Sequence, residues 1–129
     1  MSGRRTTIDE LLKDARAELQ RLSPREARDA VRDGALLIDI RSETQHACDG
    51  TLPQATAVAR NVLEWRLDPA SPHRDRTLAR RDLAVIVICN EGYQSSLAAA
   101  TLRTFGLDAT DVIGGFQAWR ADGLEVLAP

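Results

Sequence analysis

The feature that most restricts how this chain folds is an apolar run, Leu83-Ala-Val-Ile-Val-Ile-Cys89, which is rich in branched aliphatic residues. Runs of this length and composition are typical of a strand that is buried on both faces. A similar run covers residues 35–40, and residues 55–59 and 109–113 are shorter strand candidates. Helical patterns lie between these runs. The alternation predicts an α/β domain with a mostly parallel sheet covered by helices on both faces.

Capping residues and glycines predict where the helices begin and end. Thr7-Ile-Asp-Glu10 has the form of a capping box, and the apolar spacing after it predicts a helix that continues to about residue 21. Ser23-Pro-Arg-Glu26 is a second start signal, and Gly34 is the corresponding stop. Further helices are expected over residues 62–67, 95–105 and 116–122, whereas residues 42–54 and 69–82 are expected to be loops.

Size and charge limit the classes of function. The 129 residues suit one domain, and we expect an N-terminal helical extension, residues 1–22, before a main domain, residues 23–129. The chain carries 17 Lys and Arg against 19 Asp and Glu, a net charge of −2, so nucleic acid and anionic membranes are not expected partners. No apolar run approaches the ~20 residues that cross a bilayer, and the first ten residues lack the apolar segment of a secretory signal. A cytoplasmic location is therefore expected.

The chain has two cysteines, Cys48 and Cys89, and neither belongs to a C-x-x-C pair. Their neighbourhoods also lack a histidine pair at the spacing of metal ligands. The sequence therefore predicts neither a disulfide framework nor a metal site, and any cysteine chemistry is that of a free thiol. Cys48 lies in a stretch without an activating helix terminus, so we expect it to be a passive thiol.

The segment Cys89–Ser96 has the layout of a nucleophile loop. A cysteine leaves the apolar strand, a short loop containing Gly92 follows, and Ser95 begins the next helix. The backbone N–H groups of such a loop form an anion-binding nest, and the helix N-terminus adds partial positive charge, so both favour an ionised cysteine. The alternative is a cysteine that merely ends a buried strand. Asp39 and Arg41 end another predicted strand, which places them at the sheet edge where ligands of such sheets bind.

Four motifs in a consistent order connect the chain to a known family. They are Leu37-Ile-Asp-Ile-Arg41, Gly50-Thr-Leu-Pro-Gln-Ala55, Cys89-Asn-Glu-Gly-Tyr-Gln-Ser95 and Ile113-Gly-Gly-Phe-Gln-Ala-Trp119. With these motifs the chain resembles the rhodanese-like sulfurtransferase family over roughly residues 23–126. The second motif is a degraded form of the family's Gly-His-Ile-Pro-Gly-Ala segment.

The resemblance implies a three-layer α/β fold and a chemical role for one cysteine. Cys89 would accept a sulfane sulfur from a donor, rest as a persulfide and pass the sulfur to a nucleophilic acceptor. The implied partners are a small-molecule or protein persulfide donor and a thiol acceptor, and no metal or organic cofactor is expected. The N-terminal helix leaves both a monomer and a homodimer open. The candidate substrate-binding residues are Asn90, Glu91, Gly92, Tyr93, Gln94 and Ser95 in the loop, together with Arg41 and Arg60.

Two departures from the family pattern concern the donor. Gln94 stands where many members carry Arg or Thr, and Glu91 adds an acidic side chain to the loop. A carboxylate within ~4–6 Å of a reacting anion raises the energy of that anion, so the doubly charged thiosulfate is disfavoured. The sequence therefore predicts slow turnover of thiosulfate and a preference for a less charged persulfide donor.

Two other functions are weighed against sulfur transfer. The related phosphatase and arsenate reductase branch has a loop one residue longer that ends in an arginine, and this chain has Ser95 at that position. Without the guanidinium, the electrostatic stabilisation of a transferring phosphoryl group is missing. The other alternative is a non-catalytic interaction module, against which the presence of Cys89 argues.

Several neighbouring residues are assigned structural roles. Arg41 is expected to pair with Asp39 and shape the loop, with substrate contact as the alternative, and Arg60 is expected to be a surface charge that can rim the site. Ser95 is expected to cap its helix. Trp65 and Trp119 are expected in the core, and His46 and His73 are given no catalytic role.

Overall fold

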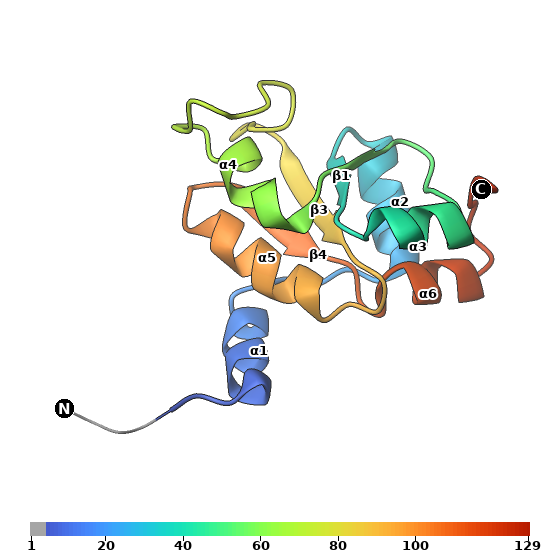
Figure 1. Cartoon of the computed structure of the whole chain (residues 1–129), viewed down its shortest axis with the longest axis horizontal. Coiled ribbons are helices and arrows are strands. Elements are labelled where there is room, and N and C mark those ends of the chain that lie inside the picture. Colours follow the sequence, from blue (N-terminus) through green and yellow to red (C-terminus); the bar gives the residue numbers. More distant parts are fainter. Residues whose placement is uncertain (1–4) are drawn as a thin grey trace.

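In the computed structural model, which describes residues 5–129, four parallel strands form one sheet in the order β2-β1-β3-β4 (Figure 1). The strands are β1 (Leu36–Asp39), β2 (Ala55–Ala57), β3 (Ala84–Ile88) and β4 (Asp108–Asp111). Each predicted strand is present: β1 and β3 are one residue shorter at each end, β2 ends two residues early, and β4 begins one residue earlier and ends two residues earlier than predicted. The α/β class is confirmed. β1 and β3 form the central pair of the sheet, and in their register Leu37 lies opposite Ile86.

Helices cover both faces of the sheet. α4 (Leu63–Leu67) and α5 (Gln94–Arg103) pack on one face, and α2 (Pro24–Arg32) and α6 (Gly115–Ala121) pack on the other (Figure 1). Successive residues of β3 point to opposite faces, so Val85 and Val87 join the first cluster while Ile86 and Ile88 join the second. All four are at most 1% exposed, which explains why this strand reads as an unbroken apolar run.

The first helix, α1 (Ile8–Ala17), begins as predicted but ends early. The Thr7 side chain accepts a hydrogen bond from the Glu10 N–H, as the capping box requires. After Ala17 the chain becomes extended and Leu22 forms a parallel bridge with Val112. The bridge supplies backbone hydrogen bonds that continued helix would have to give up, so the predicted end near residue 21 is wrong.

Residues 42–54, expected to be a loop, contain a helix, α3 (Glu43–Asp49). Ser42 and Gln45 form a reciprocal capping box, with the Ser42 side chain accepting from the Gln45 N–H at 3.1 Å and the Gln45 side chain accepting from the Ser42 N–H at 3.0 Å. The Ser-x-x-Gln signal was present in the sequence and outweighs the polar composition of the segment. A short 3₁₀ helix, η1 (Arg60–Val62), leads into α4.

Candidate active site

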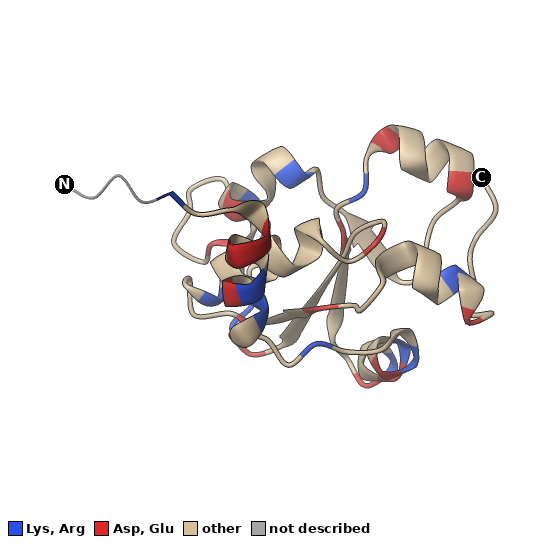
Figure 2. Ribbon diagram, turned by 90° about the horizontal axis from the view of Figure 1, so that it is seen from below, with Lys and Arg blue, Asp and Glu red and all other residues tan. Residues whose placement is uncertain are grey.

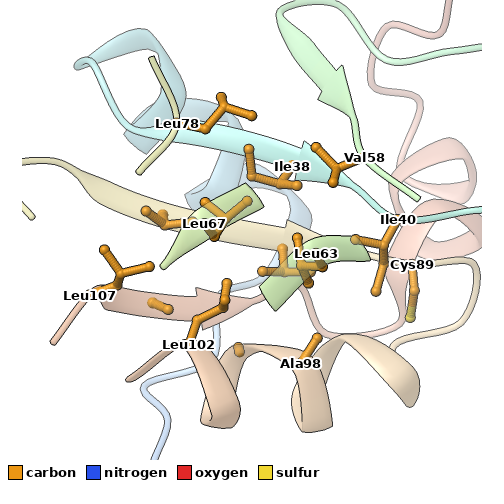
Figure 3. Close-up of a cluster of buried hydrophobic side chains, with 14 residues drawn as sticks. Ile38, Ile40, Val58, Leu63, Leu67, Leu78, Cys89, Ala98, Leu102 and Leu107 are labelled. Carbon is orange, nitrogen blue, oxygen red and sulfur yellow. The ribbon is translucent and has the colours of Figure 1, made fainter. Parts of the chain in front are cut away.

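Cys89 follows the last residue of β3, at the carboxyl edge of the sheet, and its sulfur receives two backbone donors. The Gly92 N–H and the Ser95 N–H donate to Sγ, with N-to-Sγ distances of 3.2 and 3.3 Å. The residue is 5% exposed and closes the α4/α5 side of the core beside Ile40 and Ala98 (Figure 3). Hydrogen bonds from N–H groups stabilise negative charge on sulfur, so this arrangement suits a reactive cysteine.

The loop after Cys89 is supported by the Gly114-Gly115 turn. The Phe116 N–H donates to the Cys89 carbonyl at 2.8 Å, and the Gln117 N–H donates to the Asn90 carbonyl at 3.0 Å. Gly115 has φ +61°, and a Cβ there would lie 2.5 Å from the Cys89 carbonyl oxygen. The turn therefore packs backbone to backbone against the loop, an approach that only glycine permits.

A cavity of about 750 Å³ opens at Cys89. The candidate residues that line it are Asn90, Glu91, Tyr93, Gln94, Arg41 and Arg60. Gly92 and Ser95 are buried and are not among its lining residues, and both reach the sulfur through their N–H groups instead. The structure thus brings the sequence-derived candidates together around one sulfur atom, with two of them acting through the backbone.

Arg41 is fully buried and forms the expected pair with Asp39. Its Nη2 lies 2.8 Å from Asp39 Oδ2, and the same nitrogen donates to the Gly50 carbonyl at 3.0 Å. The guanidinium also stacks on the Phe116 ring, 3.8 Å from its centroid. These contacts join the first, second and fourth sequence motifs, so Arg41 shapes the wall of the cavity.

His46 also lines the cavity, a position that the sequence did not suggest. It comes from α3, the helix that was expected to be a loop. Its Nδ1 lies 3.3 Å from Arg41 Nη2. Because a guanidinium only donates, Nδ1 accepts this bond and a neutral ring carries its hydrogen on Nε2. The Ser42-x-x-Gln45 capping box was the signal that would have placed His46 here.

Two of the predicted roles are wrong. Trp65 is 57% exposed, because Leu63 and Leu67 are the residues of α4 that face the sheet and Trp65 lies between them on the outer side. Ser95 does not cap α5, whose N-cap is Tyr93 without a side-chain bond. Trp119 is in the core as expected, 3% exposed.

The Ser95 side chain belongs to a buried network centred on Asp111. Asp111 Oδ2 accepts hydrogen bonds from the Ser95 hydroxyl at 2.7 Å and from the Ser96 hydroxyl at 2.8 Å. Arg21 completes the network with its Nε 2.8 Å from Oδ1. Asp111 is fully buried, and these partners offset the free-energy cost of burying its charge.

We expect Asp111→Ala to lower the free energy of unfolding by about 2 kcal/mol, because two buried hydroxyls and a guanidinium lose their acceptor. Asp108→Ala is the matched control on the same strand. The Asp108 side chain is 77% exposed, and its ion pair with Arg103 spans 4.0 Å. This control is expected to stay within about 0.5 kcal/mol of the wild type. Urea unfolding measures both, and equal losses in the two variants would contradict the assigned role of the network.

Among residues 5–129, no group of three or more His, Cys, Asp or Glu side chains is arranged to hold a metal ion. Within the same range, no helix has the length and apolar character needed to cross a membrane.

Comparison with known proteins gives one family. The family model described as rhodanese-like domain matches residues 23–122. A curated relative, the thiosulfate sulfurtransferase GlpE of Ectopseudomonas mendocina (strain ymp), is 34% identical over 106 residues, which cover 81% of this chain and 88% of the relative.

Two solved structures are similar to most of the chain. A protein of unknown function from Rhodopseudomonas palustris CGA009, described as a possible tyrosine phosphatase, superposes with a TM-score of 0.87 at 28% identity over 98% of both chains. The polysulfide-sulfur transferase homodimer of Wolinella succinogenes gives a TM-score of 0.71 at 25% identity, covering 92% of this chain and 85% of that one.

Proposed function

Because the chain belongs to the rhodanese-like domain family, we propose that it is a sulfurtransferase in which Cys89 carries a sulfane sulfur from a donor to a thiol acceptor. The observation that carries this proposal is the pair of N–H groups, from Gly92 and Ser95, that point at the Cys89 sulfur. They stabilise negative charge on Sγ before transfer and remain next to the persulfide after it.

The proposed cycle has two displacements. The ionised Cys89 sulfur attacks the outer sulfur of a donor RS–SH, a new S–S bond forms to Sγ, and the donor S–S bond breaks with its electron pair leaving on RS⁻. An acceptor thiolate then attacks the outer sulfur of the Cys89 persulfide, and Cys89 leaves as the thiolate. The proton on the outer sulfur moves together with that sulfur atom or exchanges with water. No external oxidant or reductant is consumed.

The charges around the cavity support a donor that carries little charge at its reacting end. Both cavity arginines are already paired, Arg41 with Asp39 at 2.8 Å and Arg60 with Glu64 at 2.7 Å. Glu91 is an exposed carboxylate in the cavity lining. Each cavity arginine therefore has its charge balanced by a carboxylate, although Arg41 Nη1 and Arg60 Nε make no hydrogen bond within the described residues. This balance disfavours a thiosulfate dianion more than a persulfide, which carries at most one charge at the sulfur that is transferred.

We expect kcat/KM for glutathione persulfide to exceed that for thiosulfate by about tenfold, the effect of ~1.4 kcal/mol of unfavourable charge interaction. Glu91→Gln should raise kcat/KM for thiosulfate about threefold and leave the persulfide value nearly unchanged. Glu125→Gln removes the same charge away from the cavity and should change neither. A wild-type preference for thiosulfate would contradict the proposed donor class.

The reaction class is tested by intact-mass analysis after incubation with glutathione persulfide and, separately, thiosulfate. A gain of one sulfur atom, removed again by a thiol acceptor, is the expected result. No gain with any sulfane-sulfur donor, in a protein whose folding is verified by circular dichroism, would favour the non-catalytic interaction module instead.

Phosphoryl transfer has less support, although one solved relative is described as a possible tyrosine phosphatase. Ser95, at the position of the phosphatase arginine, is fully buried and its hydroxyl is bonded to Asp111. As part of the proposal we retain a cytoplasmic location, persulfide and thiol partners, and the division into an extension of residues 1–22 and a domain of residues 23–129.

A further inference from the structure

The N-terminal segment reaches the loop of Cys89 with two arginines. Arg16, in the last turn of α1, donates from Nη2 to the Gly92 carbonyl at 2.7 Å, and Arg21 donates from Nη2 to the same oxygen at 3.0 Å. α1 contacts α5, the helix that follows the loop, and lies next to it in Figure 1. Both arginines precede the region that the family model matches, residues 23–122.

Gly92 is the loop residue that most needs an external anchor. It has φ +87° and no side chain, so its own conformational preference does not fix the neighbouring peptides. Its N–H is one of the two donors to the Cys89 sulfur, and its carbonyl is the group that Arg16 and Arg21 hold. Holding the carbonyl fixes the plane of the 92–93 peptide. The Gly92 N–H lies in the preceding peptide, so this contact restricts one of the two peptide planes that set the Gly92 conformation.

Arg16 differs from the other arginines around this site in its charge balance. Arg41, Arg60 and Arg21 each pair with a carboxylate, those of Asp39, Glu64 and Asp111. Arg16 makes its other hydrogen bond to the Ser96 hydroxyl at 3.1 Å, and within residues 5–129 no carboxylate lies within 4.0 Å of it. Among the described residues its positive charge therefore has no carboxylate partner next to the loop, whose own side chains contribute only the negative charge of Glu91.

The charged residues of α1 are ordered along the helix, and its basic end is the end next to the loop. Asp9 and Glu10 occupy the first turn and Arg16 the last, and Figure 2 shows acidic and basic residues on the helix that follows the N-terminal trace. This order also matches the helix dipole, since a cation is favoured at the C-terminal end.

We propose that Arg16 is a positioning residue for Cys89: it holds the Gly92 carbonyl so that the loop N–H groups stay aimed at the sulfur, and it supplies from behind the loop the positive charge that the loop side chains lack. The inference rests on the proposed sulfur transfer for its biological meaning. Its geometric part concerns only the reactivity of Cys89. Arg21 shares the contact, but its bond to buried Asp111 makes it part of the core as well.

The test compares three variants of the full chain, Arg16→Ala, Arg16→Lys and Arg25→Ala. Arg25 is the matched control, because it is an exposed helix arginine that also donates from Nη2 to a backbone carbonyl, that of Asp122 at 3.1 Å, away from the cavity. Two readouts are used: the rate of Cys89 alkylation by iodoacetamide as a function of pH, followed by intact mass, and the kinetics of sulfur transfer from glutathione persulfide.

Arg16→Ala is expected to slow alkylation at neutral pH and to lower kcat for sulfur transfer by about tenfold each, which corresponds to ~1.4 kcal/mol of lost stabilisation. KM for the donor should stay within about twofold, because Arg16 does not line the cavity. Arg16→Lys keeps the charge but not the two-pronged contact, and is expected to lie within about threefold of the wild type. Arg25→Ala is expected to behave as the wild type.

The outcomes separate this inference from the proposed function. If Arg16→Ala equals Arg25→Ala in both readouts, Arg16 is no positioning residue, whatever the wild type does. If the wild type takes up no sulfur yet Arg16→Ala slows alkylation, sulfur transfer is wrong and the positioning role stands. Should Arg16→Ala unfold at the assay temperature, Arg16→Gln replaces it in the same comparison, and an alkylation rate equal to that of Arg25→Ala would overturn the inference.

Discussion

Cys89→Ser is expected to abolish the gain of a sulfur atom from every sulfane-sulfur donor. A serine hydroxyl is a far weaker nucleophile than a thiolate and forms no persulfide, so the first displacement has no acceptor. The substitution replaces one atom at a site that is 5% exposed, and the Gly92 and Ser95 N–H groups keep an acceptor in the serine oxygen. The fold should therefore persist while sulfur uptake falls below detection in the intact-mass measurement.

Cys48→Ser is the matched control for this variant. Cys48 is the other free cysteine, exposed in the last turn of α3 and absent from the lining of the cavity. The Cys48→Ser variant should take up sulfur as the wild type does. If sulfur uptake persists in Cys89→Ser and disappears in Cys48→Ser, the sulfur is carried by Cys48, and the proposed role of Cys89 is wrong.

The second large effect is expected from Gly115→Ala, which adds one methyl group where two backbones touch. The new Cβ would lie 2.5 Å from the Cys89 carbonyl oxygen and 2.8 Å from the Gly92 nitrogen, so the loop must move by a large part of an ångström. A misplacement of about 1 Å in a reacting group costs on the order of a hundredfold in rate. We therefore expect kcat/KM for sulfur transfer to fall about hundredfold.

Gly123→Ala separates this steric effect from backbone strain. Gly123 also has a positive φ, +75°, but a Cβ there meets nothing within 4 Å. Both variants bear the cost of a left-handed alanine, about 1 kcal/mol, and only Gly115→Ala pushes on the loop. Gly123→Ala should lose some stability in urea unfolding and keep its kcat/KM. Similar kinetics in the two variants would contradict the supporting role of the Gly114-Gly115 turn.

The sequence predicted those parts of the fold that short-range patterns determine. The run 83–89 contains β3, whose residues 85–88 are buried on both faces of the sheet, and the capping residues Thr7 and Ser23 mark the starts of α1 and α2. The polar composition of residues 42–54 predicts a loop, but the Ser42 capping box there starts α3. The prediction of a core position for Trp65 is wrong because Leu63 and Leu67 are the buried residues of α4 and Trp65 lies on its other face.

The candidate site was predictable only in part. The motif order indicated the loop and Cys89, and the strand ends indicated Arg41. The contacts of Arg16 and Arg21 with Gly92 join residues 76 and 71 positions apart, and no local pattern encodes such a pairing. The sequence likewise does not indicate the partner of the Ser95 hydroxyl, because Asp111 lies next to it only when β4 is paired with β3 in the sheet.

The bridge between Leu22 and Val112, together with the arginines that precede it, bears on where this protein can be trimmed. A fragment cut to the limits of the family match, residues 23–122, keeps the cysteine and both amide donors, but its Gly92 carbonyl loses both arginine donors and keeps only the Ser96 hydroxyl at 3.3 Å, and Asp111 loses Arg21. Expression boundaries drawn from sequence homology alone would thus yield a weakened version of the loop, and assays on such a fragment would underestimate the intact chain.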